Sequence, residues 1–245
     1  MRVLVLGGTG EARALADALT DAGHAVTSSL AGRTRDPLLP KGEVRVGGFG
    51  GVPGLILYLR AQGFDYLVDA THPYAGQMSA HAVAAAEATG TPLLRLMRPA
   101  WREPDGAPWI HVRDIEEAAH ALPAGAHVLV TSGHAGLATL MHRDDCRFLL
   151  RLIEPPVEAL PAYASLLIDR PPYTVDNEAA LLEREAITHL ISKNSGGAQT
   201  EAKLEAARRC NVRVVMIDRP DVPPAPEVAS VAEALAALHE AGLRR

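Results

Sequence analysis

Four short segments of the chain place groups that can bind anions or transfer protons directly after apolar runs. They are Gly7-Gly-Thr-Gly10, Asp69-Ala-Thr-His-Pro-Tyr74, Thr131-Ser-Gly133 and Ser192-Lys-Asn-Ser-Gly-Gly197. Glycine lets a backbone approach a phosphate closely, histidine and tyrosine exchange protons, and lysine, serine and asparagine bind anions. In open parallel sheets, ligands bind outside the carboxyl ends of the strands. We therefore expect these segments to form ligand sites at the edges of such sheets.

The first segment lies between an apolar run, Val3–Leu6, and a helical pattern over residues 11–21. Gly8 and Gly10 match two glycines of the dinucleotide-binding fingerprint, whereas Arg13 stands where the third glycine would be. The first N–H groups of a helix stabilise a pyrophosphate. The alternative is a tight turn without a ligand. The predicted cofactor contacts of this segment are Gly7, Gly8, Thr9, Gly10 and Glu11.

The next predicted strand, residues 24–30, tests which dinucleotide fits. An NAD site needs an acidic residue at the end of this strand to bind the ribose 2′-hydroxyl, and the sequence has none there. It has hydroxyl and guanidinium groups, which suit a 2′-phosphate because arginine binds phosphate with a planar fork of donors. These residues are Ser28, Ser29, Arg33 and Thr34. The pattern favours NADPH; the alternative is a polar loop that faces water.

Hydroxyl, imidazole and phenol groups follow the apolar strand Tyr66–Asp69. We predict that Thr71 and Pro73 contact the cofactor, and that His72, Tyr74 or water supplies a proton during catalysis. The alternative is that these side chains bond backbone groups at the end of the sheet.

The second half of the chain offers an anion site of its own. The Ser192–Gly197 segment precedes a predicted helix over residues 198–210, whose N–H groups can hold an anion. Arg151 interrupts an apolar strand, which is costly unless the guanidinium is paired or faces a ligand. The alternative is a capped helix after a glycine turn. The predicted substrate contacts are Lys193, Asn194, Ser195, Gly196, Arg151 and Ser132.

These segments must be positioned by an α/β fold, because strand-like and helical patterns alternate almost throughout the chain. Residues 98–109 hold three prolines and both tryptophans, which indicates a linker. We predict an NADP-binding Rossmann-like domain over residues 1–97, a linker over 98–110 and a second Rossmann-like, substrate-facing domain over 111–245. Both domains would have parallel sheets, with a cleft between them.

Composition limits the other function classes. A net charge of −5 argues against a general nucleic-acid binder, and an aromatic content of 4% favours α/β layers over a β-sandwich. The two cysteines, Cys146 and Cys210, are isolated, and no metal-binding spacing is present. We expect no metal and no membrane association, because no apolar run reaches the length of a membrane span. The first residues do not resemble a signal peptide, so we expect a cytoplasmic protein.

Together these segments resemble the precorrin-6A reductase family of cobalamin biosynthesis. The resemblance rests on Gly7–Arg13, Ser29–Thr34, Asp69–Ala75, Thr131–Gly133 and Ser192–Gly197, which span nearly the whole chain. It implies NADPH-dependent reduction of one double bond of precorrin-6A to give precorrin-6B, between two Rossmann-like domains. It also implies a tetrapyrrole substrate that bears many carboxylates, with neighbouring enzymes of the pathway as candidate partners.

Other functions stay open at this point. A non-catalytic NADP-binding sensor would need no second anion-lined domain. A reductase of a small ketone predicts a Tyr-x-x-x-Lys pair, but Met78 stands four residues after Tyr74. The sequence also leaves open whether the substrate is metal-free precorrin-6A or its cobalt-containing form.

Overall fold

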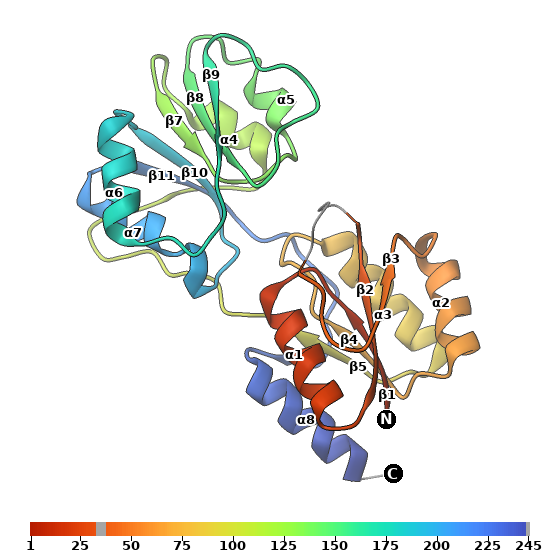
Figure 1. Cartoon of the computed structure of the whole chain (residues 1–245). Coiled ribbons are helices and arrows are strands. Elements are labelled where there is room, and N and C mark those ends of the chain that lie inside the picture. Colours follow the sequence, from red (N-terminus) through yellow and green to blue (C-terminus); the bar gives the residue numbers. More distant parts are fainter. Residues whose placement is uncertain (33–37, 244–245) are drawn as a thin grey trace. The chain divides into compact units, whose positions relative to one another are not determined.

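The computed structural model describes residues 1–32 and 38–243, which are divided between two compact units (Figure 1). The first unit comprises residues 1–99 together with the chain from Pro220 onward, and the second unit comprises residues 100–219. Each unit contains a six-stranded sheet with helices between its strands, and the strand pairs in both sheets are parallel. The α/β fold with parallel sheets, expected from the alternating patterns, is confirmed.

The first unit is built around the sheet order β12-β5-β4-β1-β2-β3, which is the strand order of a Rossmann fold. Its elements are β1 (Arg2–Leu6), α1 (Gly10–Asp21), β2 (Ala25–Leu30), β3 (Glu43–Val46), α2 (Gly51–Gln62), β4 (Tyr66–Asp69), α3 (Gly76–Thr89), β5 (Leu93–Leu96), β12 (Glu227–Val228) and α8 (Val231–Leu243).

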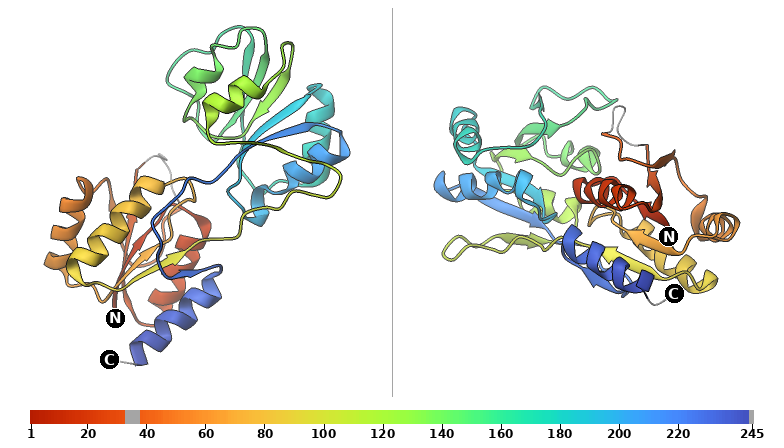
Figure 2. Two further views of the ribbon diagram at one scale, coloured as in Figure 1. Left: turned by 180° about the vertical axis from the view of Figure 1, so that it is seen from behind. Right: turned by 60° about the horizontal axis from the view of Figure 1, so that its bottom comes forward.

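Helices cover both faces of this sheet because β1 is apolar on both sides. Val3 and Val5 point into a core with α1 and α8, which lie side by side in Figure 1. Leu4 and Leu6 point into a second core with α2 and α3. The left view of Figure 2, which shows the molecule from behind, draws these two helices in orange and yellow. These four side chains of β1 are at most 2% exposed, so the strand is fixed and its carboxyl end is held in place.

The second unit repeats the same strand order as β9-β8-β7-β10-β11-β6. Its elements are β6 (Ile110–Val112), α4 (Ile115–Ala121), β7 (His127–Val130), α5 (Leu137–Leu140), β8 (Arg147–Leu152), β9 (Ala164–Ile168), α6 (Val175–Arg184), β10 (His189–Lys193), the 3₁₀ helix η1 (Ala198–Thr200), α7 (Ala202–Arg209) and β11 (Arg213–Ile217).

The sixth strand of each sheet departs from sequence order, and this changes the expected domain boundaries. β12 follows the second unit in the chain but pairs with β5 of the first, where α8 also packs. Residues 220–245 were expected in the second domain; they belong to the first unit because Ala234 and Leu238 of α8 are fully buried there.

The expected linker over residues 98–110 also differs in the structure. Trp101 and Trp109 are 7% and 8% exposed and pack in the core of the second unit. Burial of two indole rings holds this proline-rich stretch against the second sheet, and the stretch leads directly into β6. Among residues 1–32 and 38–243, no helix combines the length and apolar character needed to cross a membrane.

Candidate functional site

The Gly7–Gly10 turn joins β1 to α1 and leaves open space beside its backbone. Gly8 has a φ of +112°, a conformation that favours glycine, and a Cβ placed at Gly8 or Gly10 would meet no atom within 4 Å. The Thr9 hydroxyl accepts the N–H of Ala12 at 3.0 Å and caps the helix. Thr9 also accepts the N–H of Arg13 through its carbonyl, so Gly10 and Glu11 carry the first-turn N–H groups that suit a pyrophosphate.

A hydrogen bond links this turn to the carboxyl end of β4. The Thr9 hydroxyl donates to the carbonyl of Ala70 at 3.0 Å, and the Ala70 N–H donates to the carbonyl of Leu6 at 3.0 Å. Strand order reverses between β1 and β4, which is the point where sheets of this kind bind dinucleotides. Two segments singled out by sequence, 60 residues apart, are therefore neighbours at the expected place.

A small pocket lies where these two segments meet. It is lined by Thr9, Glu11, Thr71, Pro73, Leu96, Met97 and Arg98, so four predicted cofactor residues share it. The Arg98 guanidinium lies 2.7 Å from the Glu11 carboxylate. This ion pair neutralises a carboxylate that would otherwise repel a phosphate beside the helix N-terminus.

Asp69 organises the loop after β4 from a buried position. Its carboxylate is 1% exposed and accepts the hydroxyl and the N–H of Thr71, at 2.7 and 3.2 Å. Its other oxygen lies 3.3 Å from Nε of Arg95, whose side chain is 3% exposed. The Thr71 hydroxyl is thus occupied within the loop, and Thr71 reaches the pocket as part of a fixed turn.

His72 and Tyr74 lie together on this loop, and both are half-buried. The Tyr74 N–H donates to Nδ1 of His72 at 3.3 Å, and the two ring centroids are 5.7 Å apart. Because Nδ1 accepts a hydrogen bond, a neutral His72 carries its proton on Nε2. Imidazole Nε2 and the tyrosine hydroxyl are the side-chain atoms of these two residues that can carry a proton.

The end of β2 differs from the sequence expectation in one respect. Ser28 and Ser29 are consecutive strand residues, so their side chains point to opposite faces of the sheet and not to one shared phosphate. Ser28 is 2% exposed and its hydroxyl has no hydrogen-bond partner among residues 1–32 and 38–243, whereas the Ser29 hydroxyl accepts a bond from Arg45 at 2.6 Å. Arg33 and Thr34 lie outside the described residues.

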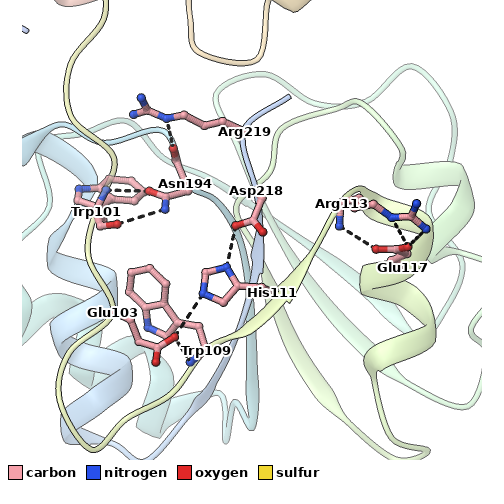
Figure 3. A network of polar contacts seen from close by, with 9 residues as sticks. All are labelled: Trp101, Glu103, Trp109, His111, Arg113, Glu117, Asn194, Asp218 and Arg219. Atoms are coloured by element: carbon pink, nitrogen blue, oxygen red, sulfur yellow. Dashed lines mark hydrogen bonds and ion pairs between the residues drawn. The ribbon is translucent and has the colours of Figure 1, made fainter. Parts of the chain in front are cut away.

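In the second unit, Asn194 ties together two segments that are distant in sequence (Figure 3). Its side-chain amide accepts the N–H of Trp101 at 2.8 Å and donates to the Trp101 carbonyl at 3.2 Å. Its backbone carbonyl accepts Nε of Arg219 at 2.8 Å. The amide was expected to contact substrate; in the structure it bonds the backbone of Trp101, and the Asn194 carbonyl makes the contact with Arg219.

A histidine makes a second tie between the same ends, also drawn in Figure 3. His111 of β6 lies 2.7 Å from the Asp218 carboxylate and 3.3 Å from that of Glu103. The hydrogen bond to Asp218, together with the charges of both carboxylates, raises the pKa of His111 above its ordinary value, against a smaller effect of burial. Below that pKa the imidazolium bridges two carboxylates.

Arg151, another predicted substrate contact, is occupied within the protein. It is buried and donates to Glu178 at 2.5 Å, and its guanidinium lies 4.0 Å from the Tyr173 ring centroid. An arginine in an apolar strand is tolerated when its guanidinium is paired. Of the two possibilities for Arg151, pairing within the protein or facing a ligand, the structure shows pairing.

Lys203 of α7 is a residue that sequence reasoning missed. It is 4% exposed, and its ammonium lies 4.8 Å from the Trp101 ring centroid. The pKa of Lys203 is lowered to about 7, first by burial and then by the charge of Arg151, while the charge of Glu178 opposes the shift. Buried groups with strongly shifted pKa values gather at functional sites, and only the fold reveals this burial.

The remaining predicted substrate contacts follow two strands of the second sheet. Ser132 follows β7, is 5% exposed, and its hydroxyl has no hydrogen-bond partner in the part of the chain that the structure describes. Lys193 is the last residue of β10, and its carbonyl accepts the N–H of Ser195 at 2.8 Å. Gly196 has a φ of +67° and turns the chain toward η1. β7 and β10 pair directly and run parallel, so these residues lie together at the carboxyl ends of the strands.

Comparison with known proteins shows which family this chain resembles. A family model described as "Precorrin-6x reductase CbiJ/CobK" matches residues 2–239. A precorrin-6A reductase from Rhodococcus erythropolis is 48% identical over 238 residues, covering 96% of each chain. A solved structure titled "CobK precorrin-6A reductase" is 44% identical, with a TM-score of 0.91, and the match covers 98% of this chain and 96% of that one.

A relative named for the cobalt-containing substrate is less similar in sequence. A cobalt-precorrin-6A reductase from Priestia megaterium is 28% identical over 234 residues, covering 90% of this chain and 91% of its own. Because the family model spans nearly the whole chain, this protein belongs to the precorrin-6x reductase CbiJ/CobK family, oxidoreductases whose substrate is precorrin-6A.

Proposed function

We propose that this protein uses NADPH to reduce one carbon–carbon double bond of precorrin-6A, giving precorrin-6B. Its family is one of oxidoreductases, which implies a nicotinamide cofactor. The observation that carries the proposal is the meeting of the Gly7–Gly10 turn with the loop after β4, around one pocket, where strand order reverses. The absence of an acidic residue at the end of β2 supports NADPH over NADH.

The first unit would hold the cofactor through backbone and small side chains. Bound NADPH supplies the hydride, and the protein supplies position and electrostatics. Arg98 keeps the Glu11 carboxylate neutralised beside the phosphate site, and Asp69 fixes the loop that presents His72 and Tyr74. The proton would come from Nε2 of His72 or from the Tyr74 hydroxyl. The proposed cofactor contacts are Gly7, Gly8, Thr9, Gly10, Glu11, Ser29, Thr71 and Pro73.

The second unit would hold the acidic arms of the macrocycle. Ser132, Lys193, Ser195 and Gly196 are the proposed contacts, because they follow two paired strands at one edge of the sheet. Asn194 and Arg151 would act as positioning residues, since their side chains already bond Trp101 and Glu178.

The activity is tested with purified protein, NADPH and precorrin-6A. We expect loss of the reduced-nicotinamide absorbance only when the tetrapyrrole is present, with NADH at least about tenfold less effective because its contact set lacks one charge-assisted interaction. NADPH binding without turnover would favour a sensor, and turnover of small ketones would favour an ordinary carbonyl reductase.

The form of the substrate is tested in the same assay. The relative named for cobalt-precorrin-6A is more distant in sequence than the precorrin-6A reductase, which supports the metal-free substrate. We expect a higher kcat/KM with precorrin-6A than with cobalt-precorrin-6A. The reverse order would assign this chain to the cobalt form.

The substrate side is tested with Lys193→Ala, with titrations of NADPH and of the macrocycle made separately. The variant should bind the macrocycle more weakly and NADPH as before, and the loss should shrink at high salt because an accessible ion pair is screened. Unchanged macrocycle affinity at low salt would make the Lys193 loop purely structural.

A further inference from the structure

Arg45 is held rigidly at the carboxyl end of β2 and β3. It lies directly opposite Ser29 in the parallel register of the two strands. Its Nη1 donates to the Ser29 hydroxyl at 2.6 Å and to the Gly47 carbonyl at 3.0 Å, and its Nη2 donates to the Gly48 carbonyl at 3.0 Å. The guanidinium carbon lies 3.8 Å from the ring centroid of Phe49. Four contacts thus fix the plane of one side chain.

None of these contacts neutralises the positive charge. The partners of Arg45 are a hydroxyl, two carbonyls and aromatic rings, and no carboxylate lies within ion-pair distance among the described residues. Glu43, the acidic residue on the same strand and face, accepts a hydrogen bond from Thr27 instead. An arginine held in place by neutral partners is suited to an anionic ligand.

The unused donors match a phosphate. Contacts within residues 1–32 and 38–243 occupy three of the five guanidinium N–H groups, and they do not use Nε–H or the second Nη2–H. The Ser29 oxygen accepts from Arg45, so its own hydrogen remains available to a ligand. A phosphate monoester carries oxygens for all three donors and about two negative charges.

We propose that Arg45, with Ser29, binds the 2′-phosphate of NADPH and sets the preference for this cofactor over NADH. The inference rests on the proposed function, because it takes its ligand from the position of the adenosine ribose at the end of β2. In this assignment Arg45 takes the place of Ser28 as a phosphate contact, because Ser28 faces the opposite side of the sheet. The assignment uses only residues within the described ranges.

The test compares the intact wild-type protein with Arg45→Gln and Arg45→Lys by calorimetric titration with NADPH, NADH and 2′,5′-ADP. Loss of a charge-assisted phosphate contact should weaken NADPH and 2′,5′-ADP by about tenfold or more in Arg45→Gln, with NADH changed by less than about threefold. Arg45→Lys keeps the positive charge but lacks the planar fork of donors, so its affinity for NADPH should lie between those of the wild-type protein and Arg45→Gln. The matched control is Arg60→Gln, an exposed arginine of α2 that donates to Ala88, which should alter none of the titrations.

Two outcomes would overturn the role of Arg45. Equal weakening of NADPH and NADH, in a variant with unchanged thermal unfolding, would show that Arg45 only shapes the Gly47–Gly48 backbone. A wild-type preference for NADPH that Arg45→Gln retains would place the 2′-phosphate elsewhere. Failure of the proposed function is distinct: a wild-type protein that binds NADPH no better than NADH would refute the cofactor itself.

Discussion

At the scale of single residues, two glycines of the first unit show opposite constraints. A Cβ at Gly10 meets no atom within 4 Å, whereas a Cβ at Gly54 would lie 1.7 Å from the Phe49 carbonyl oxygen. Gly10→Val should therefore change the free energy of unfolding by less than about 1 kcal/mol, because β-branched residues are tolerated in helices at small cost. It should abolish NADPH binding, because the side chain enters the space reserved for the pyrophosphate.

Gly54→Ala is the contrasting variant for that experiment. Its Cβ forces the backbone of α2 to shift, which should cost about 3 kcal/mol or more of unfolding free energy. Urea denaturation and NADPH titration of both variants decide the question. A folded Gly10→Val protein that binds NADPH normally would remove the Gly7–Gly10 turn from the cofactor site.

Lys203 makes a residue-scale prediction about pH. Its pKa is about 7 in the folded chain and near 10.5 when the chain is unfolded. Between these values the unfolded state binds a proton that the folded state lacks, so Lys203 lowers stability increasingly as pH falls from 10.5 to 7. Lys203→Met should raise the free energy of unfolding at pH 7 by roughly 2–4 kcal/mol, after loss of the contact with Trp101 is deducted.

The gain in Lys203→Met should fade toward pH 10.5, where the lysine is neutral in both states. Urea denaturation at neutral and alkaline pH measures this difference, with Arg213→Met on the exposed end of β11 as a surface control. A stability gain that is equal at both pH values would show that Lys203 is not a desolvated cation.

At the scale of elements, local patterns predicted the strands and turns that build the cofactor site. β1, the glycine turn and α1 have strong local signals, and so does the polar exit of β4. β6 has three residues and β12 has two, so neither has a pattern long enough to recognise; their pairing with distant strands creates them. The β9 strand, Ala164–Ile168, has five residues, but it lies after a proline-rich stretch and is half exposed, so its pairing with β8 is visible only in the structure.

The candidate site divides along the same line. Glycines and the loop after β4 are visible in sequence because their residue types are unusual at strand ends. Arg45 and Lys203 are ordinary charged residues on a strand and a helix; what sets them apart is the fixed partners of Arg45 and the burial of Lys203. Arg151 and Asn194 were recognised as unusual, but only the structure shows that their side chains are occupied by Glu178 and Trp101.

Helix caps allow a prediction at this scale. Thr9 caps α1 and also bonds the Ala70 carbonyl, whereas Asp114 caps α4 by accepting the N–H of Glu117 at 2.9 Å. Thr9→Ala and Asp114→Ala should each cost about 1–2 kcal/mol of unfolding free energy. Only Thr9→Ala should also raise the Kd for NADPH, because it releases the turn from β4, and Thr9→Ser should restore both. Equal Kd values in the two alanine variants would show that the link to Ala70 does not organise the cofactor site.

At the scale of the whole molecule, each sheet takes its sixth strand from the place in the chain where the other sheet would be expected to take it. β6 follows β5 in the chain but pairs with β11 of the second sheet, and β12 follows β11 but pairs with β5 of the first. The chain leaves the first unit after Pro99, completes the second unit within residues 100–219, and then returns to supply β12 and α8. The second unit is therefore continuous in sequence, and the first is not. This difference predicts that the two units respond differently to being separated.

We expect residues 100–219 to fold alone and residues 1–99 to fail, although sequence analysis placed a domain boundary at residue 97. Without α8, the core around Val3 and Leu15 loses Ala234 and Leu238, and burial of a leucine side chain alone contributes about 1.5–3 kcal/mol. Joining residues 1–99 to 220–245 through a flexible linker should restore cooperative thermal unfolding and NADPH binding. The same fusion with Leu238→Asp should lose both, because a carboxylate cannot be buried there without a partner. Cooperative unfolding of residues 1–99 alone, at the temperature of the fusion, would show that the returning segment is dispensable for the fold.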